Sequence, residues 1–168
     1  MIAESLTKRL KDKSLIRSAG LVAGLWRDQS TTGKVFEVVN PATGETIAFL
    51  PDMGATETAE AIVAASCAQS DWAAHTGKER AAILRRLHDL MVANADDLAT
   101  IITSEMGKPW AEARGEVLYG ASYVEWFAEE AKRVYGETIP GHQRDKRLTV
   151  IRQPVGVVGA ITPWNFPN

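Results

Sequence analysis

Apolar and polar positions divide the chain into a strand-rich beginning, a helical middle and a strand-rich end. Within residues 19–50, short apolar runs with β-branched and aromatic side chains alternate with turn sequences, a pattern that predicts short strands. The runs are GLVAGLW, KVFEVVN and ETIAFL, and the turns are TTGK and PATGE. From residue 56 to about residue 134, apolar positions recur at the helical spacing of about three to four residues, which predicts helices.

Local capping signals mark where three of these helices begin or end. Thr56 is a candidate N-cap of the first helix, and Thr76 with Glu79 has the spacing of a capping box for the second. Asn94 is a candidate cap of the third helix, which Gly107 is expected to end. The second helix carries one apolar face, formed by Ile83, Leu84, Leu87, Leu90 and Met91.

A fourth, longer helix is predicted from Pro109 to about Val134, and Gly136 follows its end. At about 100° per residue this helix has two apolar faces. One face is the stripe Val117, Ala121, Val124, Ala128 and Ala131, and the nearly opposite face carries Tyr119, Tyr123 and Trp126. A helix that is apolar on both sides is packed between other elements or borders a cavity.

Two strand patterns follow this helix. RLTVIRQ, residues 147–153, alternates imperfectly between polar and apolar positions, which is typical of a half-exposed or edge strand. VGVVGAI, residues 155–161, is continuously apolar, as expected of a strand buried on both faces of a parallel sheet. Ligands of such sheets bind beyond the carboxyl ends of the strands. The segment Thr162–Asn168 is therefore expected to form a loop that faces a crevice.

Composition and charge limit the classes of function. The chain has 168 residues, 45% of them hydrophobic and 24% charged, which is the mixture of a folded globular domain. The net charge of −2 gives no general reason to bind nucleic acid or an anionic membrane surface. No apolar stretch approaches the ~18 residues that span a bilayer, and the polar N-terminus has no secretory apolar region. With a single cysteine in the chain, the expected compartment is the reducing cytoplasm.

Few residues carry obvious chemistry. The three histidines and the single cysteine lack metal-ligand spacing, so no metal site is expected. Cys67 lies in the middle of a predicted helix among small residues and is expected to be a buried, inert thiol. Asn165, in ITPWNFPN, is held between two aromatic residues and two prolines. Its amide is either a donor that stabilises a developing oxyanion or an ordinary turn residue, and the residues alone leave both interpretations open.

Several motifs resemble the aldehyde dehydrogenase superfamily. They are NPATGE, EMGKP, YVEWFAEEAKRVYGETIPG and RQPVGVVGAITPWNFP, and together they cover nearly the whole chain. The stretch EWFAEEAKRVYGETIPGHQRDKRLTVIRQPVGV is most similar to the succinate-semialdehyde dehydrogenase branch. The resemblance implies an α/β fold, namely the N-terminal part of an aldehyde-dehydrogenase-like fold with a Rossmann-like cofactor domain, outer helices and an oligomerisation-arm strand.

The resemblance also implies a division of the chain. Residues 1–18 would be an N-terminal extension, and residues 19–138 the N-terminal part of the cofactor-binding domain. Residues 139–153 would form the oligomerisation arm, and residues 154–168 the first buried strand and the start of the catalytic loop in a truncated Rossmann-like core. The full-length enzyme would be a homodimer or homotetramer.

The implied activity is the NADP- or NAD-dependent oxidation of succinate semialdehyde to succinate by the full-length enzyme. Glutarate semialdehyde is an alternative substrate, and a non-catalytic, truncated interaction module is an alternative of another class. The family's nucleophilic Cys and its base Glu lie in sequence downstream of the motifs found here. The chain alone is therefore expected to be inactive.

The resemblance assigns roles to residues in two segments. Asn165 would donate its side-chain N–H to the oxyanion of the covalent adduct. The residues expected to contact the cofactor are Ile161, Thr162, Pro163, Trp164 and Asn165. The residues expected to border the substrate tunnel are Tyr119, Tyr123 and Trp126. The only small-molecule partners implied are the semialdehyde and the cofactor, with no metal, nucleic acid or membrane.

Overall fold

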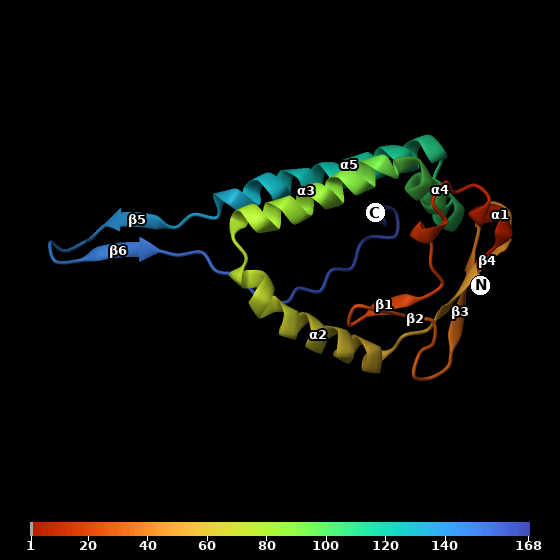
Figure 1. The fold of residues 1–168 in the computed structure, drawn as a ribbon, viewed down its shortest axis with the longest axis horizontal. Coiled ribbons are helices and arrows are strands. Elements are labelled where there is room, and N and C mark those ends of the chain that lie inside the picture. The colour runs from red at the N-terminus through yellow and green to blue at the C-terminus, as the bar shows by residue number, and fades with distance from the viewer. Residues whose placement is uncertain (1) are drawn as a thin grey trace.

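The computed structural model describes residues 2–168 and shows an α/β chain. Its helices are α1 (Glu4–Thr7), α2 (Ala55–Ala74), α3 (Gly77–Ala93), α4 (Ala95–Met106) and α5 (Trp110–Glu130), with 3₁₀ turns η1 (Lys13–Leu15) and η2 (Ala131–Arg133). In Figure 1 the helices α3 and α5 run antiparallel side by side, and α4 lies at one end of this pair. The predicted long helix is confirmed as α5, which continues into η2.

The paired strands of the described chain form antiparallel hairpins. They are β1 (Gly20–Val22) with β2 (Leu25–Arg27), β3 (Val35–Val39) with β4 (Thr46–Pro51), and β5 (Glu137–Pro140) with β6 (Arg147–Val150). The strands expected from KVFEVVN and ETIAFL are confirmed, and the strand expected over residues 147–153 is confirmed only as far as Val150. GLVAGLW is a hairpin rather than one strand, because Ala23 and Gly24 adopt positive φ values of 52° and 79° and reverse the chain.

The predicted caps are partly confirmed. The hydroxyl of Thr76 accepts a hydrogen bond from the backbone N–H of Glu79, whose carboxylate accepts from the N–H of Thr76 at 2.7 Å, so the capping box begins α3. Gly107 ends α4 with a left-handed φ of 81°. Asn94 stands at the start of α4, but its side chain donates to the carbonyl of Leu90 at the end of α3 instead of capping α4.

The prediction that Thr56 caps α2 is wrong, because the N-cap is Gly54, two residues earlier, and the helix begins at Ala55. The buried carboxylate of Glu57 accepts the backbone N–H groups of Gly54 at 2.9 Å and Thr31 at 2.6 Å. These hydrogen bonds, chiefly that from Thr31, lower the pKa of Glu57 to about 2. Glu57 therefore fixes both the start of α2 and the loop that precedes β3.

Two clusters of buried apolar residues hold the elements together. One joins α4 to α5 and consists of Ala95, Ala99, Ile102, Ala113 and Val117. Small side chains dominate this cluster, which lets the two helices approach closely. The other cluster, Leu6, Leu10 and Ile47, packs the N-terminal segment against β4. Of the predicted α5 stripe, Val117, Ala121 and Ala128 are buried, so that face is confirmed as the packed one.

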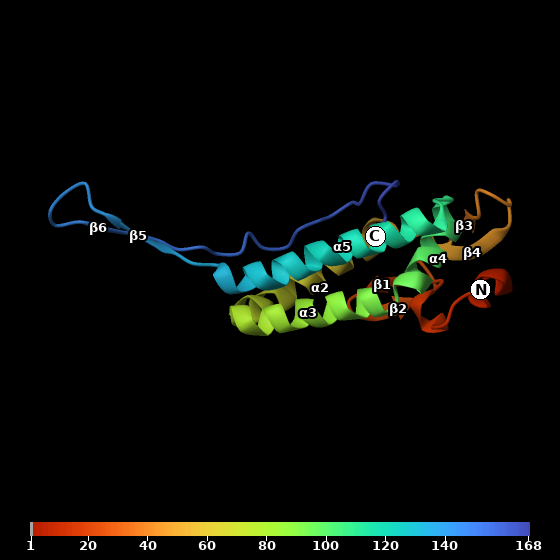
Figure 2. The same ribbon diagram turned by 90° about the horizontal axis from the view of Figure 1, so that it is seen from above.

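The prediction of a buried strand over residues 155–161 is not met in the described chain. These residues are exposed and form no strand, with Val155 93% and Ile161 fully exposed. A parallel strand needs neighbours to satisfy its backbone groups and cover its faces, and the described residues place none beside this segment. The segment instead runs back past α5 toward its N-terminal half (Figures 1 and 2).

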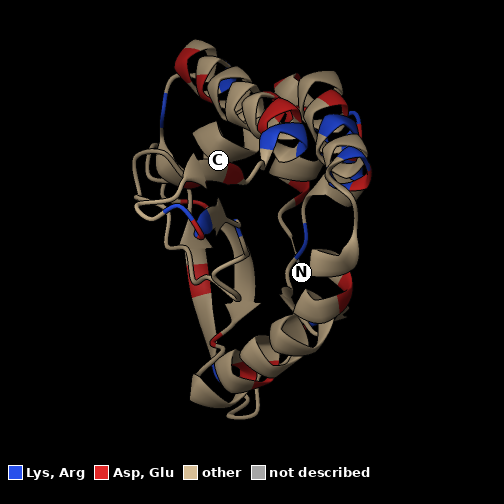
Figure 3. Cartoon of the chain, turned by 90° about the vertical axis from the view of Figure 1, so that its left-hand side faces the viewer, with Lys and Arg blue, Asp and Glu red and all other residues tan. Residues whose placement is uncertain are grey.

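Charged residues of both signs are interspersed on the helices (Figure 3). Arg85 of α3 joins the carboxylates of Glu125 and Glu129 of α5, each at 2.6 Å, and so fastens the helix pair. None of the helices formed by residues 2–168 is both long and apolar enough to cross a membrane. Over the same residues, no group of three or more His, Cys, Asp and Glu side chains is arranged to hold a metal ion.

Candidate functional site

The segment that carries Asn165 is held against α5 by a buried ion pair. Lys108, in the connection between α4 and α5, donates to the carboxylate of Glu116 and to the backbone carbonyl of Asn165, the latter at 2.7 Å. The ammonium group also lies 4.4 Å from the centre of the Phe166 ring. The second carboxylate oxygen of Glu116 accepts the backbone N–H of Asn168 at 3.0 Å.

The local sequence explains why these two charged side chains meet. Gly107 ends α4 in a conformation with positive φ, and Pro109 is the N-cap of α5, which begins at Trp110, so Lys108 lies at the corner between the helices. Glu116 follows Ala113 by three positions and precedes Val117 by one, which places it at the buried edge of α5. The side chains of Lys108 and Glu116 are only 12% and 3% exposed.

Residues 163–166 form a tight turn in which the N–H of Phe166 donates to the carbonyl of Pro163 at 3.0 Å. Asn165 lies within this turn, so the structure contains the turn that the alternative interpretation requires, and the catalytic role of its amide stays a prediction. Trp164 is 83% exposed, and the five residues expected to contact the cofactor are all exposed. They do not enclose a dinucleotide, so in the described chain they form no complete cofactor site.

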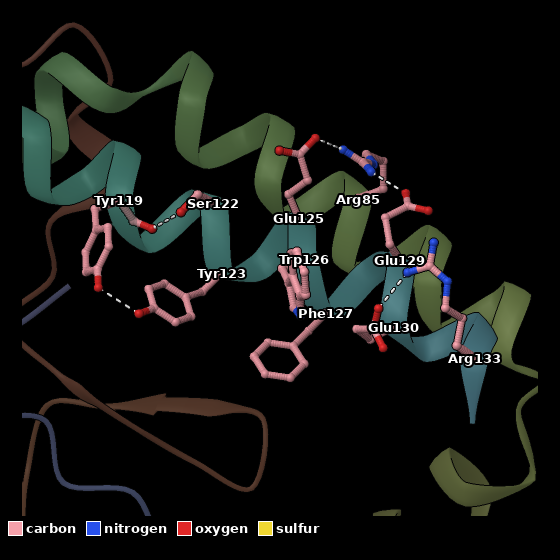
Figure 4. Close-up of a pocket in the computed structure, with 10 residues that line it drawn as sticks. All are labelled: Arg85, Tyr119, Ser122, Tyr123, Glu125, Trp126, Phe127, Glu129, Glu130 and Arg133. Atoms are coloured by element: carbon pink, nitrogen blue, oxygen red, sulfur yellow. Dashed lines mark hydrogen bonds and ion pairs between the residues drawn. The ribbon is translucent and has the colours of Figure 1, made fainter. Parts of the chain in front are cut away.

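The expected tunnel residues lie together on the open face of α5. The hydroxyl groups of Tyr119 and Tyr123 are 2.7 Å apart, and their rings meet edge to face with centres 5.0 Å apart. The hydrogen bond with Tyr123 raises the pKa of Tyr119. Both tyrosines and Trp126 line a pocket of about 830 Å³, shown in Figure 4. Its rim carries Arg85 and Arg133, both engaged with glutamates of α5.

A smaller hollow of about 320 Å³ connects the tyrosines to the Asn165 segment. Tyr119, Tyr123, Phe166 and Asn168 all line it, together with Glu116. Trp126 is not among its lining residues, so the structure brings two of the three expected tunnel residues to the loop and leaves the third along the helix. The open aromatic face of α5 therefore continues to the segment with the candidate oxyanion donor.

Cys67 does not have the surroundings that were expected. It is an exposed free thiol in the middle of α2, so the prediction of a buried thiol is wrong. The reason is that Glu57, at the start of α2, is the one buried residue of this helix, and nothing in the described chain covers its central turns. α2 contributes none of the residues that line the hollow beside the Asn165 loop.

Sequence reasoning did not single out Lys108 or Glu116. Lys108 lies in the EMGKP motif without a role of its own, and Glu116 belongs to none of the patterns described for the sequence. A usable signal was present, because Ala113, Glu116 and Val117 share the helical spacing of one face. A carboxylate on an otherwise apolar face is rarely left unpaired, so it indicates a buried partner.

Comparisons with known proteins show what the chain is similar to. Residues 26–168 match the model of the aldehyde dehydrogenase family. The chain is 58% identical over 159 residues to a glutarate-semialdehyde dehydrogenase of Pseudomonas putida, covering 95% of this chain and 33% of that protein. It is 55% identical over 159 residues to an NADP(+) succinate-semialdehyde dehydrogenase of Escherichia coli, again covering 95% and 33%. A crystal structure of an aldehyde dehydrogenase from Brucella melitensis biovar abortus is 61% identical, with a TM-score of 0.91 over 94% of this chain and 32% of that one. The chain thus spans about a third of the length of the curated relatives it matches.

Proposed function

Because the chain belongs to the aldehyde dehydrogenase family, we propose that the complete protein containing this sequence oxidises succinate semialdehyde to succinate with NADP or NAD. The observation that carries the proposal is the similarity over nearly the whole chain to semialdehyde dehydrogenases, at 55% and 58% identity. Glutarate semialdehyde is the second candidate substrate, since one of these two relatives is named for it.

The proposed role of this chain centres on Asn165. When a thiolate adds to the aldehyde carbon, negative charge develops on the carbonyl oxygen, and a fixed amide N–H donor stabilises that charge. The chain supplies this donor in a turn held against α5. Cys67 is exposed on α2 and is not the proposed nucleophile, so we expect the 168 residues alone to be inactive.

Residues 161–165 can form only one wall of a cofactor site, because all five are exposed. We propose that Thr162, Pro163 and Trp164 contribute that wall, with Ile161 before them and Asn165 at its end. The β5–β6 hairpin extends from the helical body with all of its strand residues exposed (Figures 1 and 2). Such unpaired strand edges support the further proposal that the hairpin joins subunits of a homodimer or homotetramer.

The function is tested by assaying the purified complete protein with succinate semialdehyde and glutarate semialdehyde, each with NAD and with NADP. The expected result is the highest kcat/KM for succinate semialdehyde and no turnover by the 168-residue polypeptide. A higher kcat/KM for glutarate semialdehyde would reassign the substrate. Failure to oxidise either compound with either cofactor would remove the proposal.

The tunnel assignment predicts that Tyr123→Ala raises the KM for the aldehyde by about tenfold, the equivalent of ~1.4 kcal/mol of lost contact. Tyr123 is 51% exposed, so its removal should change the melting temperature little. Tyr123→Phe is the control, since it keeps the ring and removes only the hydroxyl that bonds Tyr119. Steady-state kinetics measure the KM, and thermal unfolding measures the melting temperature. A lowered melting temperature with an unchanged KM would show that Tyr123 is a packing residue.

A further inference from the structure

We infer that the ion pair between Lys108 and Glu116 is a positioning device, which sets the backbone of the Asn165 loop and through it the direction of the Asn165 amide. The inference rests on the proposed function, because it gives the pair a purpose only if Asn165 acts in the reaction. It concerns two residues that touch the backbone of the loop and are not themselves proposed to touch substrate.

The loop is connected to the rest of the described chain by few hydrogen bonds. Residues 161–168 are exposed, and within the described chain the hydrogen bonds that tie them to the rest of the protein both end on this pair. Lys108 donates to the carbonyl of Asn165, and Glu116 accepts from the N–H of Asn168. The pair therefore holds the backbone of the loop at Asn165 and at Asn168.

Lys108 and Glu116 both contact backbone groups of the loop. A hydrogen bond to the Asn165 carbonyl restrains the peptide plane that follows this residue and thereby the direction in which its side chain leaves the backbone. The ammonium of Lys108 also lies 4.4 Å from the centre of the Phe166 ring, which restrains the next residue. The Asn165 side chain is left available to a substrate.

The charged groups of Lys108 and Glu116 are largely removed from water. Removing two charges from water is costly, so an ion pair as enclosed as this one is weak evidence for a purely stabilising role. The carboxylate of Glu116 is used on both oxygens, one by Lys108 and one by Asn168. This full satisfaction gives the pair a single geometry, which suits a device that must place another group accurately.

The expected loss of kcat depends on how accurately the Asn165 amide must be placed. A displacement of about 1 Å in a catalytic group can lower the rate by about 10²-fold. We therefore expect Lys108→Met in the complete dehydrogenase to lower kcat by about that factor. Cofactor affinity is expected to change little. Lys108→Arg keeps the charge and a donor and should recover part of the loss.

The deciding measurement is a double-mutant cycle with Asn165→Ala. If Lys108 acts through Asn165, Lys108→Met should lower kcat strongly in the wild-type background and by less than about threefold in the Asn165→Ala background. Equal losses in both backgrounds would overturn the inference, since a general structural defect does not depend on the Asn165 amide.

Two further variants keep the test decisive if Lys108→Met folds poorly. The double variant Lys108→Met with Glu116→Leu leaves no unpaired buried charge, so it should fold and still show the low kcat. Lys132→Met is the matched control, because Lys132 forms an exposed ion pair with Glu129 at 2.9 Å and should retain full activity. Wild-type kcat in the folded double variant would overturn the inference.

The design separates this inference from the function on which it rests. Absence of aldehyde oxidation by the wild-type complete protein would end both. Activity that falls sharply on Asn165→Ala but stays within about threefold of wild type on Lys108→Met would retain the function and reject the positioning role, because a 10²-fold loss is expected from misplacement.

Discussion

Replacing Asn165 with alanine in the complete protein, with the activity proposed above, is expected to lower turnover by about 10²–10³-fold, or roughly 3–4 kcal/mol of transition-state stabilisation. In the proposed role, the amide would donate to an oxygen whose charge is larger in the transition state than in the bound aldehyde, so its loss should fall on kcat rather than on substrate binding. The structure supports this role by holding the backbone of Asn165 through Lys108 at 2.7 Å while its side chain stays exposed.

The companion variant Asn165→Asp is expected to be worse than alanine, because a carboxylate would face a developing anion. The dissociation constant of the cofactor should change little in both variants, because Asn165 stands only at the end of the proposed cofactor wall and its amide is proposed to face the substrate oxygen. Single-turnover kinetics and equilibrium cofactor titration measure the two effects separately. Turnover by Asn165→Ala within about threefold of wild type would show that Asn165 only completes the turn, since an oxyanion donor is worth far more.

The elements that could be predicted from the sequence are those whose signals are local. Thr76 and Glu79 form the expected capping box, and Gly107 ends α4 with the expected positive φ. The membership of the stripe containing Val117 could be predicted because helical periodicity determines which residues share a face. Each of these features depends on neighbours within about four positions along the chain.

The predictions that failed depend on partners distant in sequence. VGVVGAI has the composition of a buried strand, but a strand requires neighbours that residues 2–168 do not provide. Cys67 is exposed because nothing in the described chain covers the middle of α2. The composition of a segment indicates which neighbours it requires, but not whether the rest of the chain provides them.

The residues of the candidate site also fall into those that local patterns predict and those that depend on distant contacts. Asn165 and the tyrosines were identified from motif and periodicity, and the structure places Tyr119 and Tyr123 beside Phe166 of the loop. The pair of Lys108 and Glu116 was missed, because its contacts with Asn165 and Asn168 span 57 and 52 positions. Contacts of such separation leave no periodic trace in a single sequence.

The isolated 168-residue polypeptide is expected to self-associate or to populate a loosely packed state at roughly micromolar concentrations. Val155, Val158, Ile161 and Trp164 are 93%, 69%, 100% and 83% exposed, so one continuous segment presents apolar side chains to water. Its unpaired backbone groups can also form a ladder with another copy. Burial of this surface between copies is favourable at about 25 cal/mol per Å², and the buried clusters within the chain are small by comparison.

Light scattering after size-exclusion chromatography measures the association, and thermal unfolding followed by near-UV circular dichroism measures the packing. The double variant Val158→Lys with Ile161→Lys is the matched control, because it places charges on the exposed segment and leaves both buried clusters intact. It should be more monomeric than the unmodified polypeptide, since charged residues on an open strand oppose pairing. A monomeric polypeptide with a sharp and reversible unfolding transition would show that residues 2–168 are stable alone and that the exposed segment does not drive association.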